Sequence, residues 1–316
     1  MQDNKQRRHK VLVAVDGSDQ SLQAVRYVGM IFPAGQTEVV LFNVTDKLPD
    51  LFLELKNNAL YGAQMSRLQQ WVSRQGQSVS EFMDSAEEEL SAAGFPRDAV
   101  KKVMRQRKLD VERDVVKESY EGYSAVVVGR TGMSQLKDVL LKSLAIRLVD
   151  KIRHLPVIVV GGVPNSNRIF MAFDGSAGAM RGVSWVGKLL GGSDCPMMLY
   201  SLLSTSGRFW VGDEEVFVNG ESEDPVEAGK QSIAPRVEEA RDLLVEQGVH
   251  ADRISEKIKV IETDRAGHIV EAASCSGFGS VVVGRRGLIS MFEQFLFGRV
   301  SQKVLNLADD LAVWVI

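Results

Sequence analysis

The chain has 316 residues, of which 45% are hydrophobic and 25% charged, and this length suits two hydrophobic cores better than one. The formal net charge of −3 argues against a nucleic-acid partner, because nucleic-acid-binding proteins usually present a strongly basic face. No apolar stretch approaches the length of a membrane span, so we expect no membrane partner either.

The amino-terminal segment and the cysteines point to a cytoplasmic protein. The first ten residues are polar and basic, and the apolar run behind them ends at Asp16, too soon for a secretory signal. Only two cysteines occur, Cys195 and Cys275, and their positions suggest neither a metal site nor a redox pair. We therefore expect a cytoplasmic protein without a structural metal.

The sequence contains an internal repeat. Residues 11–18, V-L-V-A-V-D-G-S, match residues 169–176, I-F-M-A-F-D-G-S. Residues 122–132 match residues 277–287 in the same way, and both end in V-V-V-G-R-x-G. Because the copies keep their register within a few residues, each half is one complete structural unit.

The joint between the copies falls at residues 161–167, a cluster of Gly, Pro, Asn and Ser that is typical of a linker. We therefore predict two domains, residues 1–162 and residues 163–316.

Each half begins with a strand, a turn and a helix. The first strand ends at Asp16, and the Asp-Gly-Ser of residues 16–18 is typical of a turn followed by a helix N-cap. The helix that follows carries Gly29, matched by Gly187 in the second copy. We expect these glycines to let the helix lie close on the sheet. The next strand is predicted at residues 39–44.

Further strands and helices alternate along the rest of each half. The next helix ends at Gly94, a candidate C-cap. The third strand has the weakest pattern, near residues 101–106, and residues 257–261 are its clearer copy. Buried strands follow at residues 126–128 and 157–160, with helices between them. Continuous apolar strands that alternate with helices predict a parallel, doubly wound sheet.

Glycines follow the fourth strand of the second half, residues 281–283. They are Gly284, Gly287 and Gly298, and a helix begins after the last of them. Glycines between a strand and a helix N-terminus let backbone N–H groups approach an anion, most often a phosphate. The apolar face of this last helix is predicted to hold Val300, Val304, Leu307 and Leu311.

Two segments differ between the copies, and both follow the second strand. Residues 45–77 are largely helical in pattern, whereas residues 204–229 are rich in glycine and acidic residues, with apolar patches at residues 209–211 and 216–218. Both segments therefore leave the sheet at the carboxyl end of a strand, and open α/β sheets bind ligands at the carboxyl ends of their strands. A lid or partner-docking flap and a tolerated surface insertion are both compatible with these segments.

An Asp after the first strand, a G-x-x-G turn after the fourth and a further Gly before the last helix resemble the universal stress proteins. The tandem arrangement is similar to that of the two-domain members, over nearly the whole chain except the two insertions. The resemblance implies an α/β fold with two tandem doubly wound five-stranded parallel sheets, of the adenine nucleotide alpha hydrolase-like type, in strand order 3-2-1-4-5. It also implies pairing through the last strands, residues 157–160 with residues 312–315, and, in one subgroup, ATP binding.

For the second half, the resemblance implies a nucleotide site. Asp174 would lie near the ribose or a Mg²⁺ ion, and Leu202 would place a backbone group against the base. The glycines and Ser301 would hold phosphates. The implied nucleotide-binding residues are Ala172, Asp174, Leu202, Val283, Gly284, Arg285, Gly287, Gly298, Arg299, Val300 and Ser301.

The sequence departs from the ATP-binding pattern of the family, G-x2-G-x9-G-[ST]. Both copies have ten residues, not nine, before the third glycine position. In the second copy Arg299 replaces the following hydroxyl residue, and this arginine either binds phosphate or blocks the pocket. In the first copy Ser143 replaces the glycine, and Ile146 stands opposite Ser301. The resemblance therefore implies a weaker first site, with Asp16, Val44, Gly129 and Gly132.

Two functions follow as hypotheses. The first is a stress-related regulatory protein that binds ATP or AMP, with or without Mg²⁺, mainly in the second half. No general base or nucleophile stands near the glycines in sequence, so we expect no catalytic residues and at most slow ATP hydrolysis. The second is a nucleotide-free interaction module of the same fold. Helix faces or the two insertions could join two chains into a homodimer.

The basic residues at 101–108 allow two interpretations. They could attract an anionic partner, or they could form a solvated strand edge beside an acidic helix, which we favour.

Overall fold

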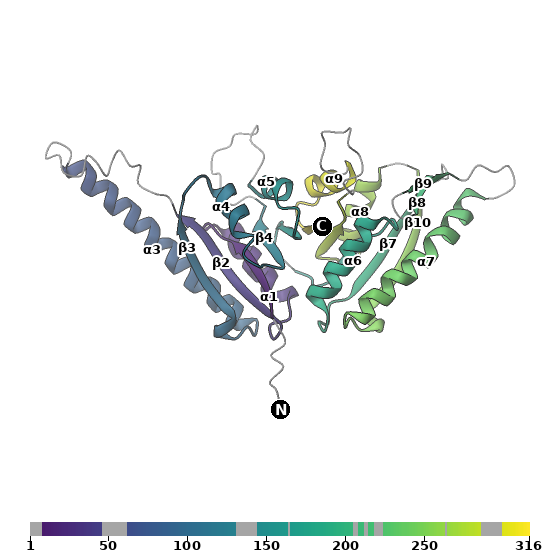
Figure 1. The fold of residues 1–316 in the computed structure, drawn as a ribbon, viewed down its shortest axis with the longest axis horizontal. Coiled ribbons are helices and arrows are strands. Elements are labelled where there is room, and N and C mark those ends of the chain that lie inside the picture. The colour runs from purple at the N-terminus through teal and green to yellow at the C-terminus, as the bar shows by residue number, and fades with distance from the viewer. Residues whose placement is uncertain are drawn as a thin grey trace, which may run out of the picture. The chain divides into compact units, whose positions relative to one another are not determined.

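The computed structural model divides the chain into two compact units, Met1–Gly29 with Ala34–Lys151 and Met30–Pro33 with Ile152–Ile316 (Figure 1). Each unit is described by itself. The structure describes residues 8–45, 62–130, 144–163, 165–204, 208–211, 214–217, 224–262, 264–285 and 299–316.

The first unit contains a parallel sheet in the order β3-β2-β1-β4. Helices connect the strands, so the predicted alternation is confirmed. The strands are β1 (His9–Ala14), β2 (Thr37–Thr45), β3 (Val100–Gln106) and β4 (Ala125–Gly129), and the helices are α1 (Asp19–Ile31), α3 (Gly62–Ala92), α4 (Val111–Glu118) and α5 (Leu144–Lys151), with a short 3₁₀ turn η2 (Arg97–Ala99).

The second unit contains the complete sheet of one repeat, in the order β10-β7-β6-β11-β12. Numbered within the repeat, this is the order 3-2-1-4-5, as predicted. The strands are β6 (Ile169–Ala172), β7 (Met197–Ser204), β10 (Ile254–Ile261), β11 (Ser280–Val283) and β12 (Ala312–Val315), and the helices are α6 (Ala177–Leu190), α7 (Pro225–Glu246), α8 (Arg265–Cys275) and α9 (Arg299–Leu307), with the 3₁₀ turn η3 (Ala251–Arg253).

The last strand of the first repeat, β5 (Val157–Val160), belongs to the second unit. It pairs antiparallel with β12, and Val157 lies opposite Val315. The pairing predicted for these two strands is confirmed. The core of this region includes Trp314, which is fully buried and stacks on Phe32 with ring centroids 5.8 Å apart. Contacts thus assign β5 to the second unit, whereas the predicted domain boundary at residues 162–163 follows the repeat.

Burial explains which strands are easy to recognise in the sequence. The central strands β4 and β11 are buried along their whole length and consist almost entirely of small and β-branched residues. The edge strands β3 and β10 are exposed at most positions, although both lie where the repeat predicts a third strand. An edge strand has a neighbour on one side only, so its sequence need not be apolar.

The helix α3 is continuous from Gly62, and it runs beside β3 in Figure 1. Its residues 62–77 confirm the helical part of the first insertion; residues 46–61 lie outside the described part of the chain. The helix ends as predicted at Gly94, which has φ of +93° and donates its N–H to Ser91 O. A left-handed glycine after the last turn is a common helix stop.

The role predicted for Gly29 and Gly187 is wrong. A Cβ at Gly29 would lie 2.9 Å from the Cβ of Ala93, just beyond the end of α3. A Cβ at Gly187 would collide with the side chain of Gln247, just beyond the end of α7. These glycines therefore let each helix approach the end of the next helix rather than the sheet.

The predicted apolar face of the last helix is also partly wrong. The helix α9 ends at Leu307, which is 45% exposed, and Leu311 lies beyond the helix near the start of β12. The buried residues of the helix are Ser301, Val304 and Leu305. Leu311 is buried because it leads into a buried strand and not because it belongs to the helix.

The second insertion contains a two-stranded antiparallel sheet that the sequence analysis did not identify. Its strands are β8 (Arg208–Val211) and β9 (Glu214–Phe217), and Phe209 lies opposite Val216. The sequence Gly-Asp between the two strands is a two-residue hairpin signal that could have identified it.

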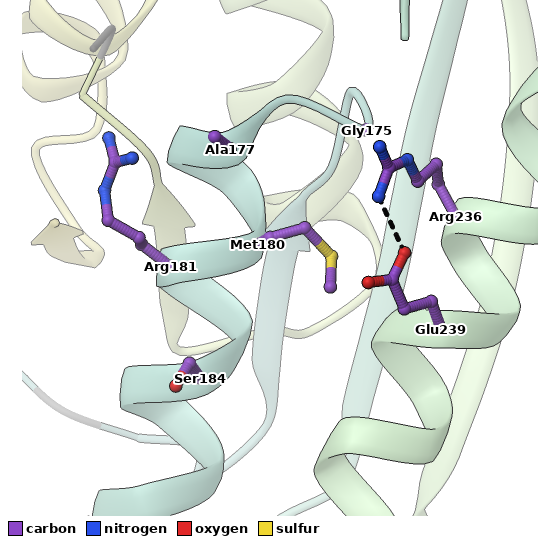
Figure 2. Close-up of a pocket in the computed structure, with 7 residues that line it drawn as sticks. All are labelled: Gly175, Ala177, Met180, Arg181, Ser184, Arg236 and Glu239. Carbon is purple, nitrogen blue, oxygen red and sulfur yellow. Dashed lines mark hydrogen bonds and ion pairs between the residues drawn. The ribbon is translucent and has the colours of Figure 1, made fainter. Parts of the chain in front are cut away.

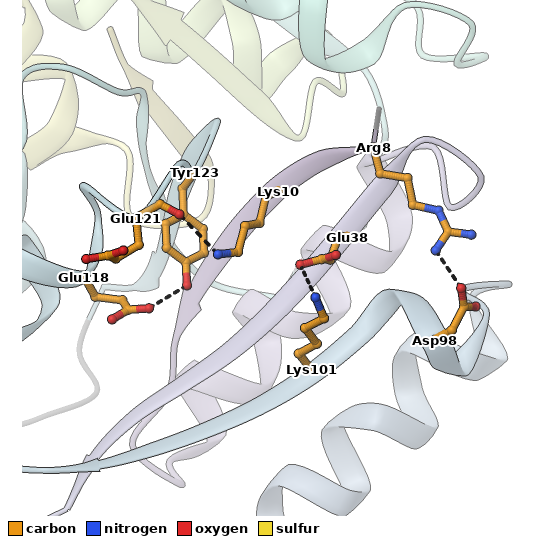
Figure 3. Close-up of polar contacts among 8 residues, drawn as sticks. All are labelled: Arg8, Lys10, Glu38, Asp98, Lys101, Glu118, Glu121 and Tyr123. Carbon is orange, nitrogen blue, oxygen red and sulfur yellow. Dashed lines mark hydrogen bonds and ion pairs between the residues drawn. The ribbon is translucent and has the colours of Figure 1, made fainter. Parts of the chain in front are cut away.

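Carboxylates pair with the basic residues of β3, as the favoured interpretation expected (Figure 3). Lys101 Nζ lies 3.0 Å from Glu38 Oε1, and Lys102 Nζ lies 2.7 Å from Asp84 and 2.6 Å from Glu87, both on α3. Carboxylates of the same unit therefore neutralise most of the positive charge along β3.

Within the described residues, no helix has the length and apolar character that crossing a membrane requires.

Candidate functional site

Three neighbouring parallel strands of the second unit end at one edge of the sheet. In β6, Met171 lies opposite Leu199 of β7 and Val282 of β11. The strand ends that the sequence assigned to the site, Ala172, Leu202 and Val283, therefore lie at the carboxyl edge of adjacent strands. This is the edge at which open α/β sheets bind ligands.

Asp174 lies in the turn between β6 and α6 and is exposed. Its Oδ1 accepts a hydrogen bond from the N–H of Ser176, 3.1 Å away. Ser176 is the N-cap of α6, and its Oγ accepts from Ala179 N at 3.2 Å. Asp174 thus shapes the turn and Ser176 caps the helix, while the Asp174 carboxylate remains at the edge within reach of solvent.

Close packing alone requires a glycine at position 284. A Cβ there would lie 2.5 Å from the carbonyl carbon of Gly178 and 2.8 Å from Ala179 N, in the first turn of α6. In the first unit, a Cβ at Gly129 would lie 2.7 Å from the carbonyl oxygen of Gln20 in α1. The first glycine of the G-x-x-G turn therefore has a packing role in both repeats.

The backbone of Arg285, directly after this glycine, is held on both sides. Its N–H donates to the carbonyl oxygen of Ile316. Its carbonyl oxygen accepts from Arg181 Nη2 at 3.3 Å. Figure 2 shows the Arg181 side chain extending from α6 toward the segment that follows β11. The sequence analysis missed Arg181; comparing the two copies of the first helix, where Gln23 takes its place, could have identified it.

Ser301 lies in the second position after Arg299, where α9 begins, and only 2% of it is exposed. Its buried neighbours on the helix are Val304 and Leu305, and the matching buried residues of α5 are Ala145, Leu148 and Val149. The burial pattern therefore makes Ala145 the equivalent of Ser301 in the first repeat. The predicted equivalence of Ile146 with Ser301 is wrong by one residue. In either register the first repeat has no hydroxyl at this position.

An ion pair ties α9 to α8. Lys303 Nζ lies 2.7 Å from Asp264 Oδ1, and the same oxygen accepts from Gly267 N at 3.1 Å. The hydrogen bond from Lys303, and next that from Gly267, hold the pKa of Asp264 below its ordinary value of 3.8. Asp264 is the N-cap of α8 and adopts a left-handed φ of +49°.

The corresponding edge of the first unit is arranged differently. Asp16 Oδ1 accepts from Ser18 N at 3.0 Å and from Ser18 Oγ at 2.6 Å. Asn43, only 3% exposed, donates from Nδ2 to Val15 O at 2.7 Å, beside the predicted site residue Val44. The sequence analysis missed Asn43, although a polar residue within an apolar strand was a signal.

The cations of the last helix in the first unit are paired with a buried carboxylate. Arg147 Nε lies 2.6 Å from Glu112 Oε2, and Lys151 pairs with the other oxygen of Glu112, a residue only 8% exposed. These charges are therefore less available to an anion at the first edge.

A hollow of about 340 Å³ lies between α6 and α7. Figure 2 shows that Met180 points into it from α6, while Arg236 and Glu239 face it from α7. Arg236 Nη1 and Glu239 Oε2 pair at 2.8 Å. Gly175, in the turn after β6, also lines the hollow, so it adjoins the carboxyl edge of the sheet.

Several predicted site residues lie outside the described part of the chain. These are Gly287 and Gly298 in the second repeat and Gly132 and Ser143 in the first, and the side chain of Arg299 is likewise not described. Whether Arg299 binds or blocks a phosphate therefore stays open, and the roles given to these residues stay predictions.

Solved structures similar to the whole chain support the fold. A universal stress protein from Archaeoglobus fulgidus DSM 4304 is 18% identical, with a TM-score of 0.58, over 100% of this chain and 98% of that one. A functionally unknown protein from Pseudomonas aeruginosa PAO1 is 14% identical, with a TM-score of 0.53, over 99% and 94%. A putative universal stress protein from Pseudomonas aeruginosa UCBPP-PA14 is 15% identical, with a TM-score of 0.51, over 99% and 95%.

Among curated proteins, no significant match to the chain is found. The sequence model of the universal stress protein family matches twice, at residues 7–161 and 165–315. The two matches agree with the internal repeat and with the sheet order of the second unit. The chain therefore belongs to the universal stress protein family, as a tandem member with two copies of the family's domain.

Proposed function

We propose that the chain is a stress-related regulatory protein that binds an adenine nucleotide, ATP or AMP, at the carboxyl edge of the second repeat. The observation that carries this proposal is the Gly284–Arg285 turn, which follows β11 beside the end of β6 and has the guanidinium of Arg181 against it. A cationic donor at such an edge favours a phosphorylated ligand. Family membership supports the same proposal.

In this proposal the protein holds the nucleotide without consuming it. Backbone N–H groups of the glycine turn bind the phosphates, and Asp174 binds the ribose or a Mg²⁺ ion. At the described edge, the Asp174 carboxylate accepts a hydrogen bond that shapes its own turn. Because one carboxylate oxygen forms the turn and the other would contact the ribose or Mg²⁺, Asp174 is not left to act as a general base, and we expect ATP hydrolysis to be slow or absent.

The first repeat binds nucleotide more weakly in this proposal. It has Ala145 where the second repeat has Ser301, and Gln23 where the second repeat has Arg181. Each lost hydroxyl contact costs about 1 kcal/mol, and about 1.4 kcal/mol is a factor of ten in affinity. We further propose a cytoplasmic protein that forms a homodimer through helix faces or the two insertions.

Ligand retention and thermal unfolding test the proposal. Protein purified without added nucleotide is denatured, and the supernatant is assayed for ATP and AMP. Separately, unfolding is followed with millimolar ATP and Mg²⁺. A ligand at a hundred times its dissociation constant adds about 2.7 kcal/mol, so the unfolding temperature should rise by several degrees. No retained nucleotide together with no shift would contradict the proposal.

A nucleotide-free interaction module is the second candidate. The observation that favours it is the packing of Gly129 and Gly284 against the first turns of α1 and α6, because this packing explains both glycines without a ligand. The burial of Ser301 points the same way. In that case the two insertions carry the function, and deleting residues 205–223 should abolish partner binding while millimolar ATP leaves the unfolding temperature unchanged.

A further inference from the structure

We propose that Arg181 is a positioning residue that makes the second repeat selective for phosphorylated ligands. This inference rests on the proposed function and names the residue that distinguishes the two edges. Arg181 lies in the second turn of α6, and its Nη2 donates to the carbonyl oxygen of Arg285 at 3.3 Å. The bond joins the first helix of the repeat to the turn from which the glycine-rich loop departs.

The turn is held from three directions. The N–H of Arg285 donates to Ile316 O at the end of β12, and Ile316 N donates to Val283 O at 3.1 Å. Gly178 allows the Arg285 carbonyl to approach α6, because a Cβ at position 178 would collide with that oxygen. Arg181 then supplies a hydrogen bond to the same oxygen. Of the contacts named here, only the one from Arg181 comes from a side chain.

Holding this carbonyl restricts the backbone of Arg285 itself. A peptide unit is planar, so fixing the direction of its carbonyl fixes the orientation of the whole unit. A turn that is already ordered loses less conformational entropy when an anion binds.

The guanidinium also contributes charge. It is permanently protonated and exposed beside the turn, so it raises the electrostatic potential where an anion would approach. This contribution favours ATP over an uncharged nucleoside such as adenosine. A purely structural residue would change the binding of both ligands equally.

The first repeat has Gln23 in place of Arg181. Gln23 and Arg181 occupy equivalent positions in the two repeats. Gln20 lies against Gly129 as Gly178 lies against Gly284, and Gln23 and Arg181 each follow three residues later in their helix. Gln23 is neutral, and its Oε1 is buried without a hydrogen-bond partner among the described residues. The Nε2 group of Gln23 can donate a hydrogen bond, but the side chain is uncharged and adds no electrostatic attraction for a phosphate.

The test exchanges the two residues in the full-length chain. The variants are Arg181→Gln, Arg181→Lys, Gln23→Arg and the double exchange. Dissociation constants for ATP and adenosine are measured by titration calorimetry. Hydrogen–deuterium exchange of residues 280–285 is measured without ligand, and residues 125–129 are the internal control.

We expect Arg181→Gln to weaken ATP binding by about tenfold or more and adenosine binding by less than twofold. Exchange at residues 280–285 should rise, while residues 125–129 stay unchanged. Arg181→Lys keeps the charge and a donor, so it should restore most of the ATP affinity. Gln23→Arg should strengthen ATP binding at the first edge.

Two results overturn the inference alone: wild-type protein binds ATP but Arg181→Gln binds it equally well, or ATP and adenosine weaken in parallel with a fall in unfolding temperature. A wild-type protein that binds neither ATP nor inorganic tripolyphosphate overturns the proposed function, and the inference with it. The two failures are therefore distinguishable.

Discussion

At the scale of single residues, the two repeats show that the first glycine of the G-x-x-G turn serves packing. Gly284 and Gly129 have backbone of the first helix within 3 Å of where a Cβ would lie. Sequence reasoning assigned both glycines to phosphate binding because a glycine turn before a helix is typical of phosphate sites. A sequence does not reveal which neighbouring backbone a missing Cβ would meet, so this packing role could not be predicted.

We predict that Gly284→Ala destabilises the protein by about 1–3 kcal/mol, because the new methyl group meets backbone that cannot move independently. Urea-induced unfolding measures the loss. Gly76→Ala is the matched control, since Gly76 lies inside α3 and nothing lies within 4 Å of its would-be Cβ. The control should be stabilising by about 0.5–1 kcal/mol. Equal effects of the two substitutions would refute the packing argument.

A buried polar pair in the first repeat is replaced by apolar residues in the second repeat. In the first unit, Tyr123 donates its hydroxyl to Glu118 Oε1 at 2.8 Å, and Glu118 Oε2 lies 2.7 Å from Arg105 (Figure 3 shows the first of these contacts). Burial, and next the Glu118 carboxylate, raise the pKa of Tyr123 above its usual value of 10.0. The second repeat has Phe278 and Ala273 at the matching positions.

We predict that substitutions of Glu118 and Tyr123 have non-additive effects on the free energy of unfolding. Glu118→Ala alone leaves a buried hydroxyl without its acceptor and should cost about 1–3 kcal/mol. Adding Tyr123→Phe removes that hydroxyl, so the double variant should be more stable than the sum of the two single changes implies. Urea midpoints of the four proteins give the coupling. Strict additivity would show that the hydroxyl and the carboxylate do not interact.

At the scale of elements, burial decides what the sequence predicts well. The buried strands β4 and β11 are recognisable as short runs of Val, whereas the edge strand β3 has a polar and basic sequence. The helix α9 was predicted too long because Leu311, which leads into β12, falls at helical spacing from Val304. Spacing shows which residues share a face, but not where a helix ends or what covers it.

The ion pair between α8 and α9 makes a pH-dependent prediction. The pKa of Asp264 is lowered in the folded protein, so its ionised form stabilises the fold above the unfolded pKa. This contribution is lost as the pH falls below about 3.8, the ordinary value for the group. Asp264→Asn keeps a side chain that tolerates a left-handed backbone and can cap a helix.

Wild-type protein should therefore unfold at a higher temperature than Asp264→Asn at pH 6, and the difference should shrink toward pH 3. Lys303→Gln removes the partner, and in that background Asp264→Asn should have a smaller effect at pH 6. A difference in unfolding temperature that is the same at both pH values would contradict the role of the ion pair.

At the scale of the whole molecule, the same fold occurs twice, and the two copies differ at the carboxyl edge of the sheet. The repeat, the sheet order and the pairing of β5 with β12 followed from the sequence because they depend on long buried patterns. The difference between the carboxyl edges of the two repeats could be predicted from the sequence only in part. It depends on Arg181 in place of Gln23 and on the one-residue shift that sets Ser301 opposite Ala145.

The stoichiometry of nucleotide binding tests this account most directly. ATP with Mg²⁺ is titrated calorimetrically into the full-length chain at a protein concentration well above the dissociation constant of the tighter site, so that the number of sites is defined. We predict one tight site per chain, with any second site weaker by about a hundredfold, because two lost hydroxyl or charged contacts cost about 2–3 kcal/mol. Two equal sites per chain, or no binding heat at millimolar ATP, would contradict it.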